Sequence, residues 1–574
     1  MAGGRSRDGR TEVRPYGEPM TLRSDRPRPW LDHYDYWVPR HTNYPRRPLY
    51  EILRRAAAER PELPATTFLG ADLTFGELKE QVDRLATALA RLGIVKGDRV
   101  GIMLPNCPPY VIGVFAVLRL GATVVNINPA YTPPEVGFIL GDSGVRMVLT
   151  LDVLAPGLSA LKPGSVLETI VITALSEYSP AATAPAAAPG VMRLADLIAG
   201  ATEVDLPRVA IDADVDVAVL QYTGGTTGVP KAAMLTHRNI FANTIQTELW
   251  HSRSIERGQD RFLLVIPYFH IYGLTVGMMR GIWQSARQIL IPKYDVEAVL
   301  AALRDYRPTY FPAVPTIFVS LLNHPRLREF HLDRVGTYNS GSAPLPVEVL
   351  EKFERLVNVT LNEGYGLSEA SPVTHSTPHL ARRKPGSIGL PMPDTDLRIV
   401  DLETGTRELP IGAEGELCVS GPQVMKGYWN RPDETAIALR ADADGVVWLH
   451  TGDVARLDED GYTFIVQRKK DMMIVDGYNV YPSEVEAALY THPAVMEAAA
   501  YGVPHGYHGE VVKVAVVLKP GQAAVPDELR AHCASRLAEY KRPRVIEIRA
   551  SLPKSTVGKV LYTKLRAEAA VPNA

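Results

Sequence analysis

From about Pro48 onward, the apolar positions of the chain alternate between helical spacing and the short continuous runs typical of buried strands. Thr74 and Glu77 fit a capping box, and the apolar residues that follow fall on one helical stripe that Gly93 would end. Residues 99–104 and 122–127 are predicted to be strands, with a helix at 110–120 between them. This order predicts parallel sheets covered by helices on both faces.

The pattern changes near residue 470, where four charged residues (RKKD) occur in a row. Beyond them the sequence predicts a compact α+β module with three main elements: a helix at 482–490, a strand at 511–518 and a helix at 527–537. A charged run between two such blocks fits a hinge, which we place at Lys470.

The predicted fold class is therefore α/β. A large N-terminal domain of parallel and mixed sheets covered by helices would span residues 30–469, and a small mobile α+β domain would span 470–574. Residues 1–29 are rich in Arg, Gly and Pro, and they are predicted to form a disordered tail.

Composition narrows the class of protein. The 574 residues exceed one compact core, and 46% hydrophobic with 22% charged residues is ordinary for a soluble enzyme. A net charge of −2 argues against broad nucleic-acid binding. Three cysteines without metal-like spacing predict free thiols in a reducing cytoplasm. The best membrane-span candidate, 110–118, is cut off by Arg119 and is predicted to be a buried helix.

The most informative chemistry lies at residues 222–231 (YTGGTTGVPK), directly after a predicted buried strand at 215–220. Such a loop offers backbone N–H groups, hydroxyls and one positive charge to a bulky anion. These come from Gly224, Gly225, Gly228, Thr223, Thr226, Thr227 and Lys231. The loop is not a Walker A motif, because Ala232 follows the lysine where that motif has Ser or Thr.

The loop resembles the phosphate-binding loop of the adenylate-forming superfamily, which includes acyl-CoA synthetases, luciferases and peptide-synthetase adenylation domains. Five further segments resemble that superfamily in the same order: 267–273 (PYFHIYG), 340–344 (SGSAP), 362–369 (NEGYGLSE), 451–453 (TGD) and 553–560 (PKSTVGKV). Together the resemblance covers residues 49–565, which is nearly the whole chain.

The resemblance implies specific roles. Lys559 is the expected catalytic lysine of adenylation, and His270 is expected to shape or gate the entrance for the thiol. Glu369 and Thr223 are expected to bind Mg²⁺ that bridges ATP phosphates, since this ion prefers oxygen ligands.

Further residues are expected to contact ATP or AMP. Asp453, supplemented by Arg468, would bind the ribose hydroxyls. Ser368 stands where the superfamily usually has Thr, and it keeps the hydroxyl. The remaining expected contacts are Gly341, Ser342, Ala343, Glu363, Gly364, Tyr365 and Gly366. Gly477 and Tyr478 lie in a segment that resembles the loop guiding pantetheine.

Two features narrow the substrate class: the lack of an acidic residue in one segment, and the similarity of other segments to one group of enzymes. No acidic residue occurs between Pro267 and Met278, which argues against an amino-acid substrate. Residues 126–133 (NINPAYTP) and 311–316 (FPAVPT), with the doubled glycine of the loop, resemble bacterial long-chain fatty acyl-CoA synthetases. The implied reaction converts a fatty carboxylate to acyl-AMP and then to acyl-CoA, with Mg²⁺ as cofactor and ATP and CoA as co-substrates.

The sequence leaves alternative functions open. The chain could be a medium-chain or aryl-acid:CoA ligase, an acyl-AMP ligase that serves a carrier protein, or a non-catalytic nucleotide- or lipid-binding relative. The pantetheine-like loop disfavours the carrier, and the retained Lys231, Glu369, Asp453 and Lys559 disfavour the pure binder. The expected partners are a fatty acid, ATP and CoA, without nucleic acid, in the cytoplasm. A homodimer and association with the inner membrane face are further alternatives.

Overall fold

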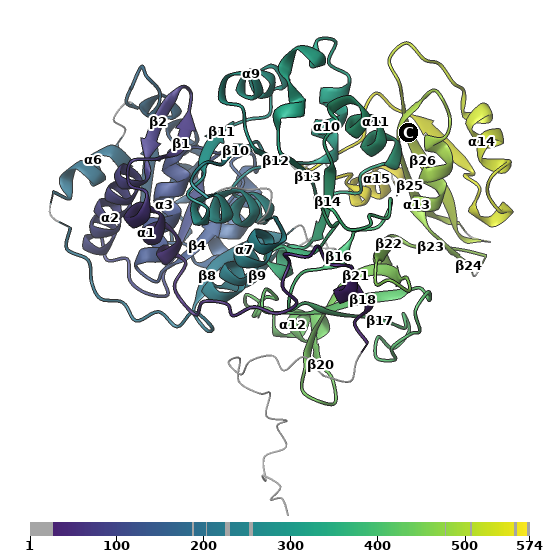
Figure 1. Ribbon diagram of the computed structural model, residues 1–574, viewed down its shortest axis with the longest axis horizontal. Coiled ribbons are helices and arrows are strands. Elements are labelled where there is room, and N and C mark those ends of the chain that lie inside the picture. Colours follow the sequence, from purple (N-terminus) through teal and green to yellow (C-terminus); the bar gives the residue numbers. More distant parts are fainter. Residues whose placement is uncertain are drawn as a thin grey trace, which may run out of the picture.

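The computed structural model describes residues 27–185, 189–202, 204–223, 230–251, 257–476, 478–505, 508–555 and 559–570. These residues form four sheets with helices around them (Figure 1). Two large sheets make up most of the chain up to residue 391, a smaller one follows, and the last lies in the C-terminal part.

The first large sheet runs in the order β16-β15-β14-β13-β12-β10-β11-β1-β2. Its strands are β16 (Leu390–Pro391), β15 (Val373–Ser376), β14 (Leu361–Gly366), β13 (Thr337–Ser340), β12 (Tyr310–Ala313), β10 (Arg261–Leu264), β11 (Arg287–Leu290), β1 (Pro64–Phe68) and β2 (Ala71–Thr74). The strands from β14 to β1 along this order are parallel, and antiparallel strands close both edges.

The second large sheet runs in the order β19-β9-β8-β4-β3-β5-β6-β7. Its strands are β19 (Gly427–Tyr428), β9 (Lys231–Thr236), β8 (Val217–Thr223), β4 (Thr123–Asn126), β3 (Arg99–Met103), β5 (Met147–Leu151), β6 (Thr169–Thr173) and β7 (Met192–Arg193). The strands from β8 to β7 are parallel, whereas β9 and β19 pair antiparallel.

The helices form layers around the two sheets. Between the sheets lie α1 (Tyr50–Glu59), α2 (Phe75–Arg91), α3 (Pro108–Arg119), α7 (His237–His251), the π-helical turn η4 (Gly273–Met279) and α8 (Arg280–Trp283). Outside the second sheet lie α4 (Pro133–Ser143) and α5 (Ala155–Leu161), with α6 (Leu194–Gly200) against α2. Outside the first sheet lie α9 (Val296–Tyr306), α10 (Pro315–Leu322) and α11 (Val347–Val357).

Helix α3 shows why the layers hold together. Every residue from Pro108 to Leu118 is buried, so the helix is apolar on all sides, as expected of a helix between two sheets. The Tyr110 hydroxyl joins both sheets, because it is 2.6 Å from Oδ1 of Asn126 and donates to the carbonyl of Tyr268 at 2.8 Å. No helix in the described part of the chain is long and apolar enough to cross a bilayer.

A small antiparallel sheet connects the large sheets to the C-terminal part. Its strands are β17 (Asp396–Val400), β18 (Gly415–Ser420), β20 (Leu439–Ala441), β21 (Val447–Leu457) and β22 (Thr463–Arg468), with α12 (Pro432–Ala438) beside them. It lies below the first sheet in the view of Figure 1.

The C-terminal part is an α+β unit at the right of Figure 1. Its strands are β23 (Met473–Val475), β24 (Tyr478–Val480), β25 (Val495–His505), β26 (Gly509–Leu518) and β27 (Val545–Ile548). Helices α13 (Pro482–Tyr490) and α14 (Pro526–Ala534) pack on one face, and α15 (Tyr562–Ala570) packs on the other. The predicted α/β class with a small C-terminal α+β domain is confirmed.

Most predicted elements agree with the observed ones to within a few residues. The capping box of Thr74 and Glu77 is present, and α13 has the predicted bounds. The strand predicted at 215–220 begins later, at Val217, because a local turn uses the backbone before it: Asp216 N–H donates to the Asp212 carbonyl at 2.8 Å. Helix α14 ends at Ala534, three residues earlier than predicted.

The three cysteines are free and buried, as predicted. Most of the tail predicted to be disordered, residues 1–26, lies outside the described residues. The predicted tail extends too far, to residue 29. Arg28 already belongs to the folded chain, since it pairs with Asp396 at 2.9 Å. The predicted boundary of 470 between domains stays a prediction.

Residues 27–48 form a strap across the large sheets. Asp35 accepts hydrogen bonds from three successive backbone N–H groups, those of His379, Leu380 and Ala381, at 2.6, 2.9 and 2.7 Å. Asp394 in turn accepts from the backbone of Thr42 at 3.0 Å. These carboxylates fix the start of the chain against the segment that follows β15.

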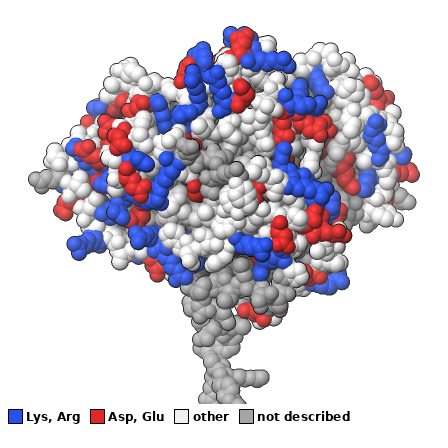
Figure 2. Space-filling model, in the orientation of Figure 1, with Lys and Arg blue, Asp and Glu red and all other residues white. Residues whose placement is uncertain are grey.

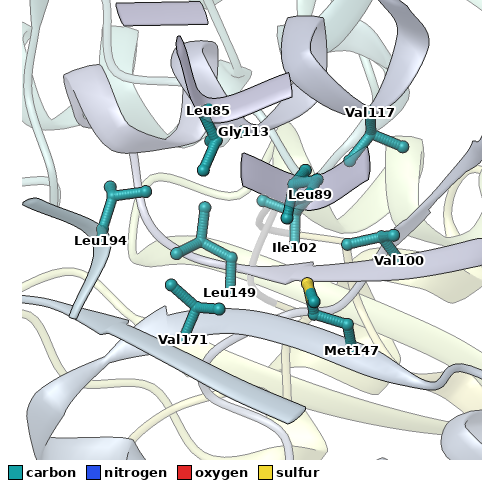
Figure 3. Close-up of a pocket in the computed structure, with 10 residues that line it drawn as sticks. All are labelled: Leu85, Leu89, Val100, Ile102, Gly113, Val117, Met147, Leu149, Val171 and Leu194. Carbon is teal, nitrogen blue, oxygen red and sulfur yellow. The ribbon is translucent and has the colours of Figure 1, made fainter. Parts of the chain in front are cut away.

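A small apolar gap lies in the helical layer, between α2, α3 and strands β3, β5 and β6 (Figure 3). Its ten lining residues are Leu85, Leu89, Val100, Ile102, Gly113, Val117, Met147, Leu149, Val171 and Leu194. None of them is polar, so the gap offers no group that would orient a ligand, and we regard it as a packing feature.

The strap gives the first testable prediction. Asp35→Ala removes the buried acceptor of three partly exposed N–H groups, so we expect the free energy of unfolding to fall by about 1–3 kcal/mol, measured by urea denaturation. Asp32→Ala is the control, since the Asp32 pair with Arg40 is exposed and should contribute less than about 1 kcal/mol. Equal stability of the Asp35 variant and the wild type would show that the strap does not hold this segment.

Candidate active site

The predicted site residues come from the ends of both large sheets, from the small sheet and from the C-terminal unit. The loop that joins β8 to β9 connects Thr223 and Lys231, which are paired opposite each other in the two strands. The Thr223 hydroxyl reaches the Lys231 carbonyl only at 3.5 Å, a long contact that leaves its geometry adaptable. Gly224, Gly225, Thr226, Thr227 and Gly228 lie outside the described residues.

Lys231 is held by α12 and β19. Its ammonium forms an ion pair with Glu434 and lies 5.6 Å from the centre of the Tyr428 ring. The Tyr428 hydroxyl in turn donates to Oε1 of Glu369 at 2.7 Å. Burial and the charge of Glu369 raise the pKa of Tyr428, which keeps this hydroxyl a donor. Lys231 and Glu369 are both predicted to serve the phosphates of ATP, Glu369 through Mg²⁺. Tyr428 brings these two side chains together.

Glu369 lies in the turn η7 (Ser368–Ala370), directly after β14. Its backbone carbonyl accepts from Met425 N–H at 2.8 Å, which fixes the turn against the segment before β19. Gly366, the last residue of β14, has no room for a side chain, because a Cβ would lie 2.2 Å from the carbonyl oxygen of Pro372. The close approach therefore fixes Ser368 and Glu369 at the end of the strand.

A single carboxylate with a nearby hydroxyl fits the predicted magnesium. Glu369 and Thr223 offer the oxygen donors that Mg²⁺ prefers. Among the described residues, no group of three or more His, Cys, Asp or Glu side chains could hold a metal. Magnesium binding by Glu369 and Thr223 stays a prediction.

Asp453 lies in β21, beside the end of β22. The Tyr365 hydroxyl donates to Oδ2, and Arg468 pairs with Oδ1 at 3.2 Å. The backbone N–H of Asp453 donates to Thr451 Oγ1 at 3.1 Å. The charge of Asp453 is the main cause of the raised pKa of Arg468, which keeps this guanidinium charged. Tyr365, Asp453 and Arg468 are thus brought together as predicted residues of one site.

The segment after β13 packs against the Tyr272 ring. We call Gly341 and Tyr272 together the Gly341 wall of the site. Gly341 lies against the Tyr272 ring, since a Cβ there would be 3.0 Å from Tyr272 Cε1. Ser342 has a φ of 72°, in the left-handed region, and turns the chain towards Ala343. Tyr272 is held from the sheet by Asn339, whose amide donates to its hydroxyl at 3.1 Å.

Glu363 and Gly364 occupy β14, beside β13. Burial raises the pKa of Glu363 to about 7, so near neutral pH its carboxyl exchanges between donor and acceptor forms. The Glu363 N–H donates to Thr377 Oγ1 at 2.9 Å. A carboxyl that is partly protonated near neutral pH therefore lies in β14, in a segment that the resemblance assigns to nucleotide binding.

His270 precedes η4 and lies two residues before Tyr272 of the Gly341 wall. The Tyr272 N–H donates to His270 Nδ1 at 3.3 Å, so in the neutral ring the proton is on Nε2. Burial lowers the pKa of His270 to about 3, and the charge of Lys559 contributes to this shift.

A tight turn positions Lys559. The Ser555 N–H donates to the Lys559 carbonyl at 2.8 Å, and the Lys559 N–H donates to Ser555 Oγ at 3.2 Å. Lys554 and Val560 pair across the same turn. The backbone of Lys559 is thus fixed from both sides.

The predicted hinge lies in the turn η8 (Lys469–Asp471). Lys469 pairs with Glu416 at 3.2 Å, and Arg566 pairs with Asp471 at 3.0 Å. One side of Lys470 is therefore tied to the small sheet and the other to α15. Tyr478 is exposed and stacks on Tyr540 with ring centres 4.8 Å apart, away from the other predicted residues.

Gly477 lies outside the described residues. Three functional candidates were missed by sequence reasoning: Tyr428 and Glu434, which contact Glu369 and Lys231, and Glu416, which contacts the hinge. None lies within a matching motif, and only the pairing of β19 with β9 brings Tyr428 to the site.

Two family models match the chain: AMP-binding enzyme over residues 53–429, and AMP-binding enzyme C-terminal domain over residues 484–559. The chain belongs to the AMP-binding enzyme family. This confirms the predicted adenylate-forming superfamily.

Known members of the family match over almost the full length. The chain is 44% identical over 562 residues to the long-chain-fatty-acid–CoA ligase of Bacillus subtilis strain 168, which covers 94% of this chain and 98% of that protein. It is similar to the ATP-bound crystal structure of MatB from Rhodopseudomonas palustris, with 30% identity, a TM-score of 0.80 and coverage of 90% and 98%. With apo MatB the TM-score is 0.71, at 30% identity and coverage of 91% and 98%.

The ion pair of Lys231 gives the second testable prediction. Glu434 neutralises a lysine that is predicted to bind phosphates, so a bound anion must compete with it. Glu434→Gln should therefore lower the dissociation constant for ATP about two- to tenfold, measured by calorimetry. Asp433→Asn, an exposed change of the same charge on the same helix, controls for net charge. Weaker binding in the Glu434 variant would instead show that Glu434 positions Lys231.

Proposed function

We propose that this chain is an ATP-dependent ligase that joins a long-chain fatty acid to coenzyme A through an acyl-AMP intermediate. The observation that carries the proposal is the link from Lys231 through Tyr428 to Glu369, which brings a cation suited to phosphates together with a carboxylate suited to a metal ion. The long-chain assignment is supported by the B. subtilis relative, which is named for that activity.

In the first half-reaction the fatty carboxylate attacks the α-phosphorus of ATP, and pyrophosphate leaves. We assign Lys559 to the charge that develops between the carboxylate oxygen and the α-phosphate, because a fixed cation stabilises that charge. Lys231 would hold the leaving phosphates and Asp453 the ribose hydroxyls, from the positions described above. Glu369 would hold Mg²⁺, which neutralises phosphate charge when it is bound.

In the second half-reaction the thiol of CoA attacks the acyl carbon. The carbon–sulfur bond forms, the bond from carbon to the AMP oxygen breaks, and the thiol proton leaves. A pKa of about 3 makes His270 a poor base in the arrangement observed, so we assign it to shaping the entrance for the thiol. When Lys559 moves away, one cause of this low pKa moves away with it.

The two half-reactions need different neighbours, and we propose that the C-terminal unit turns about Lys470 between them. The arrangement described here suits adenylation. In support, the chain is more similar to ATP-bound MatB than to apo MatB, with TM-scores of 0.80 and 0.71. The pantetheine role of Gly477 and Tyr478 rests on the resemblance alone.

A homodimer, a location in the cytoplasm and association with the inner membrane face stay predictions. The visible face of the molecule carries Lys and Arg intermixed with Asp and Glu (Figure 2), so it presents no single-sign surface to an anionic membrane.

The test of the proposed function is CoA-dependent AMP release across acetate, octanoate, palmitate, oleate, benzoate and cinnamate. We expect the highest kcat/KM with palmitate or oleate, because a long apolar chain buries more surface in the site. Assays without CoA give the background. A maximum with an aryl or short acid would overturn the substrate class, and no release with any acid would overturn the ligase itself.

A further inference from the structure

Strand β21 bulges at the residues that are predicted to bind the ribose. Val454 pairs with Glu416 of β18, whereas His450 pairs with the residue two positions beyond Glu416. Three residues of β21, 451–453, therefore lie opposite a single residue of β18. Extra residues of this kind bend a strand and redirect its side chains, and they are frequent beside active sites. The geometry of this bulge therefore sets where the carboxylate of Asp453 points.

Two side chains hold the backbone of the bulge. The Thr451 hydroxyl donates to the Leu417 carbonyl at 2.7 Å and accepts from the Asp453 N–H at 3.1 Å. Gly452 has a φ of 72°, in the left-handed region that favours glycine, and its N–H donates to Oε1 of Glu416 at 3.2 Å. The Glu416 carboxylate thus takes the place of a partner carbonyl in the interrupted ladder.

The second oxygen of Glu416 faces two basic side chains. Oε2 lies 3.2 Å from Nζ of Lys469 and 3.5 Å from Nδ1 of His450. The Glu416 side chain is 7% exposed, whereas that of Lys469 is 38% exposed. Lys469 opens the turn η8, next to Lys470, about which the C-terminal unit is proposed to turn. One buried carboxylate therefore contacts both the bulge and the predicted hinge.

The bulge and the hinge are also joined through Arg468. Asp453 pairs with Arg468 across β21 and β22, and the Arg468 guanidinium lies 3.2 Å from Oδ1 of Asp453. Arg468 is followed directly by Lys469, whose ammonium contacts Glu416. The contacts therefore form a closed ring, which returns to Asp453 through Gly452. A rotation that carries Lys469 away from the small sheet would break this ring at one link.

The two contacts of Glu416 have different consequences. The Gly452 N–H donates to a carboxylate, and a charge-assisted bond of this kind is stronger than a bond between neutral groups. The ion pair with Lys469 is partly exposed, and such pairs contribute little to overall stability. A small free energy is nevertheless enough to shift the balance between two positions of a domain. The first contact therefore bears on the ribose carboxylate, and the second on the position of the C-terminal unit.

We propose that Glu416 is a positioning residue that couples the ribose site to the hinge. It holds the backbone in front of Asp453, and through Lys469 it favours the arrangement of the C-terminal unit described above. This inference rests on the proposed ligase function and on the proposed rotation about Lys470. It adds to them a residue that acts through Asp453 and Lys469 and does not itself contact the substrate.

The ribose side of the proposal is tested with ATP, 2′-deoxy-ATP and 3′-deoxy-ATP, by kcat/KM for pyrophosphate release with palmitate. We expect the wild type to prefer ATP to at least one deoxynucleotide by at least about tenfold, because a missing hydroxyl leaves the buried Asp453 without its partner. Glu416→Ala should reduce this preference severalfold, since the bulge loses its acceptor. Lys469→Met should leave the preference unchanged, because it keeps the contact of Glu416 with Gly452.

The hinge side is tested by the ratio of two rates, pyrophosphate release and thioester formation from supplied palmitoyl-AMP and CoA. This ratio follows the balance between the two positions of the C-terminal unit. Lys469→Met should lower it about two- to fivefold, and so should Glu416→Gln, which removes the charge and keeps an acceptor. The double variant should show no further decrease, since both changes break the same ion pair.

Lys513→Met is the matched control. Lys513 pairs with Glu547 at 3.2 Å, the same distance as in the pair of Lys469, but both partners lie within the C-terminal unit. The variant loses an ion pair that does not reach the small sheet, so it should leave both the nucleotide preference and the ratio of rates unchanged.

Two results would overturn the proposal. The first is the same preference for ATP in Glu416→Ala as in the wild type, and the second is a wild-type ratio of rates in Lys469→Met. If Glu416→Ala does not fold, as judged by its melting temperature, the ratio in Glu416→Gln decides the question. Loss of both half-reactions in the wild type would instead contradict the ligase function, so the two failures are distinguishable.

Discussion

The electrostatic effect of Lys559 on His270 links the C-terminal unit to the large sheets. Lys559 is fixed by the turn around Ser555, and its charge helps to lower the pKa of His270. The large sheets and the small sheet carry the carboxylate that we assign to the ribose and the lysine that we assign to the phosphates. In the proposed mechanism the catalytic cation comes with the C-terminal unit, so the position of that unit would decide which half-reaction the site supports.

The charged residues around the predicted hinge fit a C-terminal unit whose position matters for the reaction. Lys469 is tied to Glu416 and Asp471 to Arg566, on either side of Lys470. Burial alone would raise the pKa of Glu416, but hydrogen bonding and charge from His450, with Lys469, lower it to about 2. The carboxylate is therefore ionised at neutral pH and can hold Lys469. Partly exposed ion pairs of this kind are individually weak, which is compatible with the proposed rotation about Lys470.

Much of the fold and of the site could be predicted from the sequence, because the signals were local. A capping box fixes the start of α2, and α13 follows its apolar pattern from Pro482 to Tyr490. The motif residues that the structure describes around Asp453 are brought together as predicted. The contacts of Lys231 with Glu434 could not be predicted, since they depend on a strand pairing between distant segments.

The most direct test of the account is the pair of half-reactions in Lys559→Ala, with Lys564→Ala as an exposed neighbouring control. Adenylation is measured as pyrophosphate release with palmitate and ATP, and thioester formation is measured with supplied palmitoyl-AMP and CoA. The account predicts that adenylation falls by about a hundredfold or more, while thioester formation stays within a few-fold of wild type. Equal loss of both half-reactions would contradict a lysine that serves only one of the two domain positions.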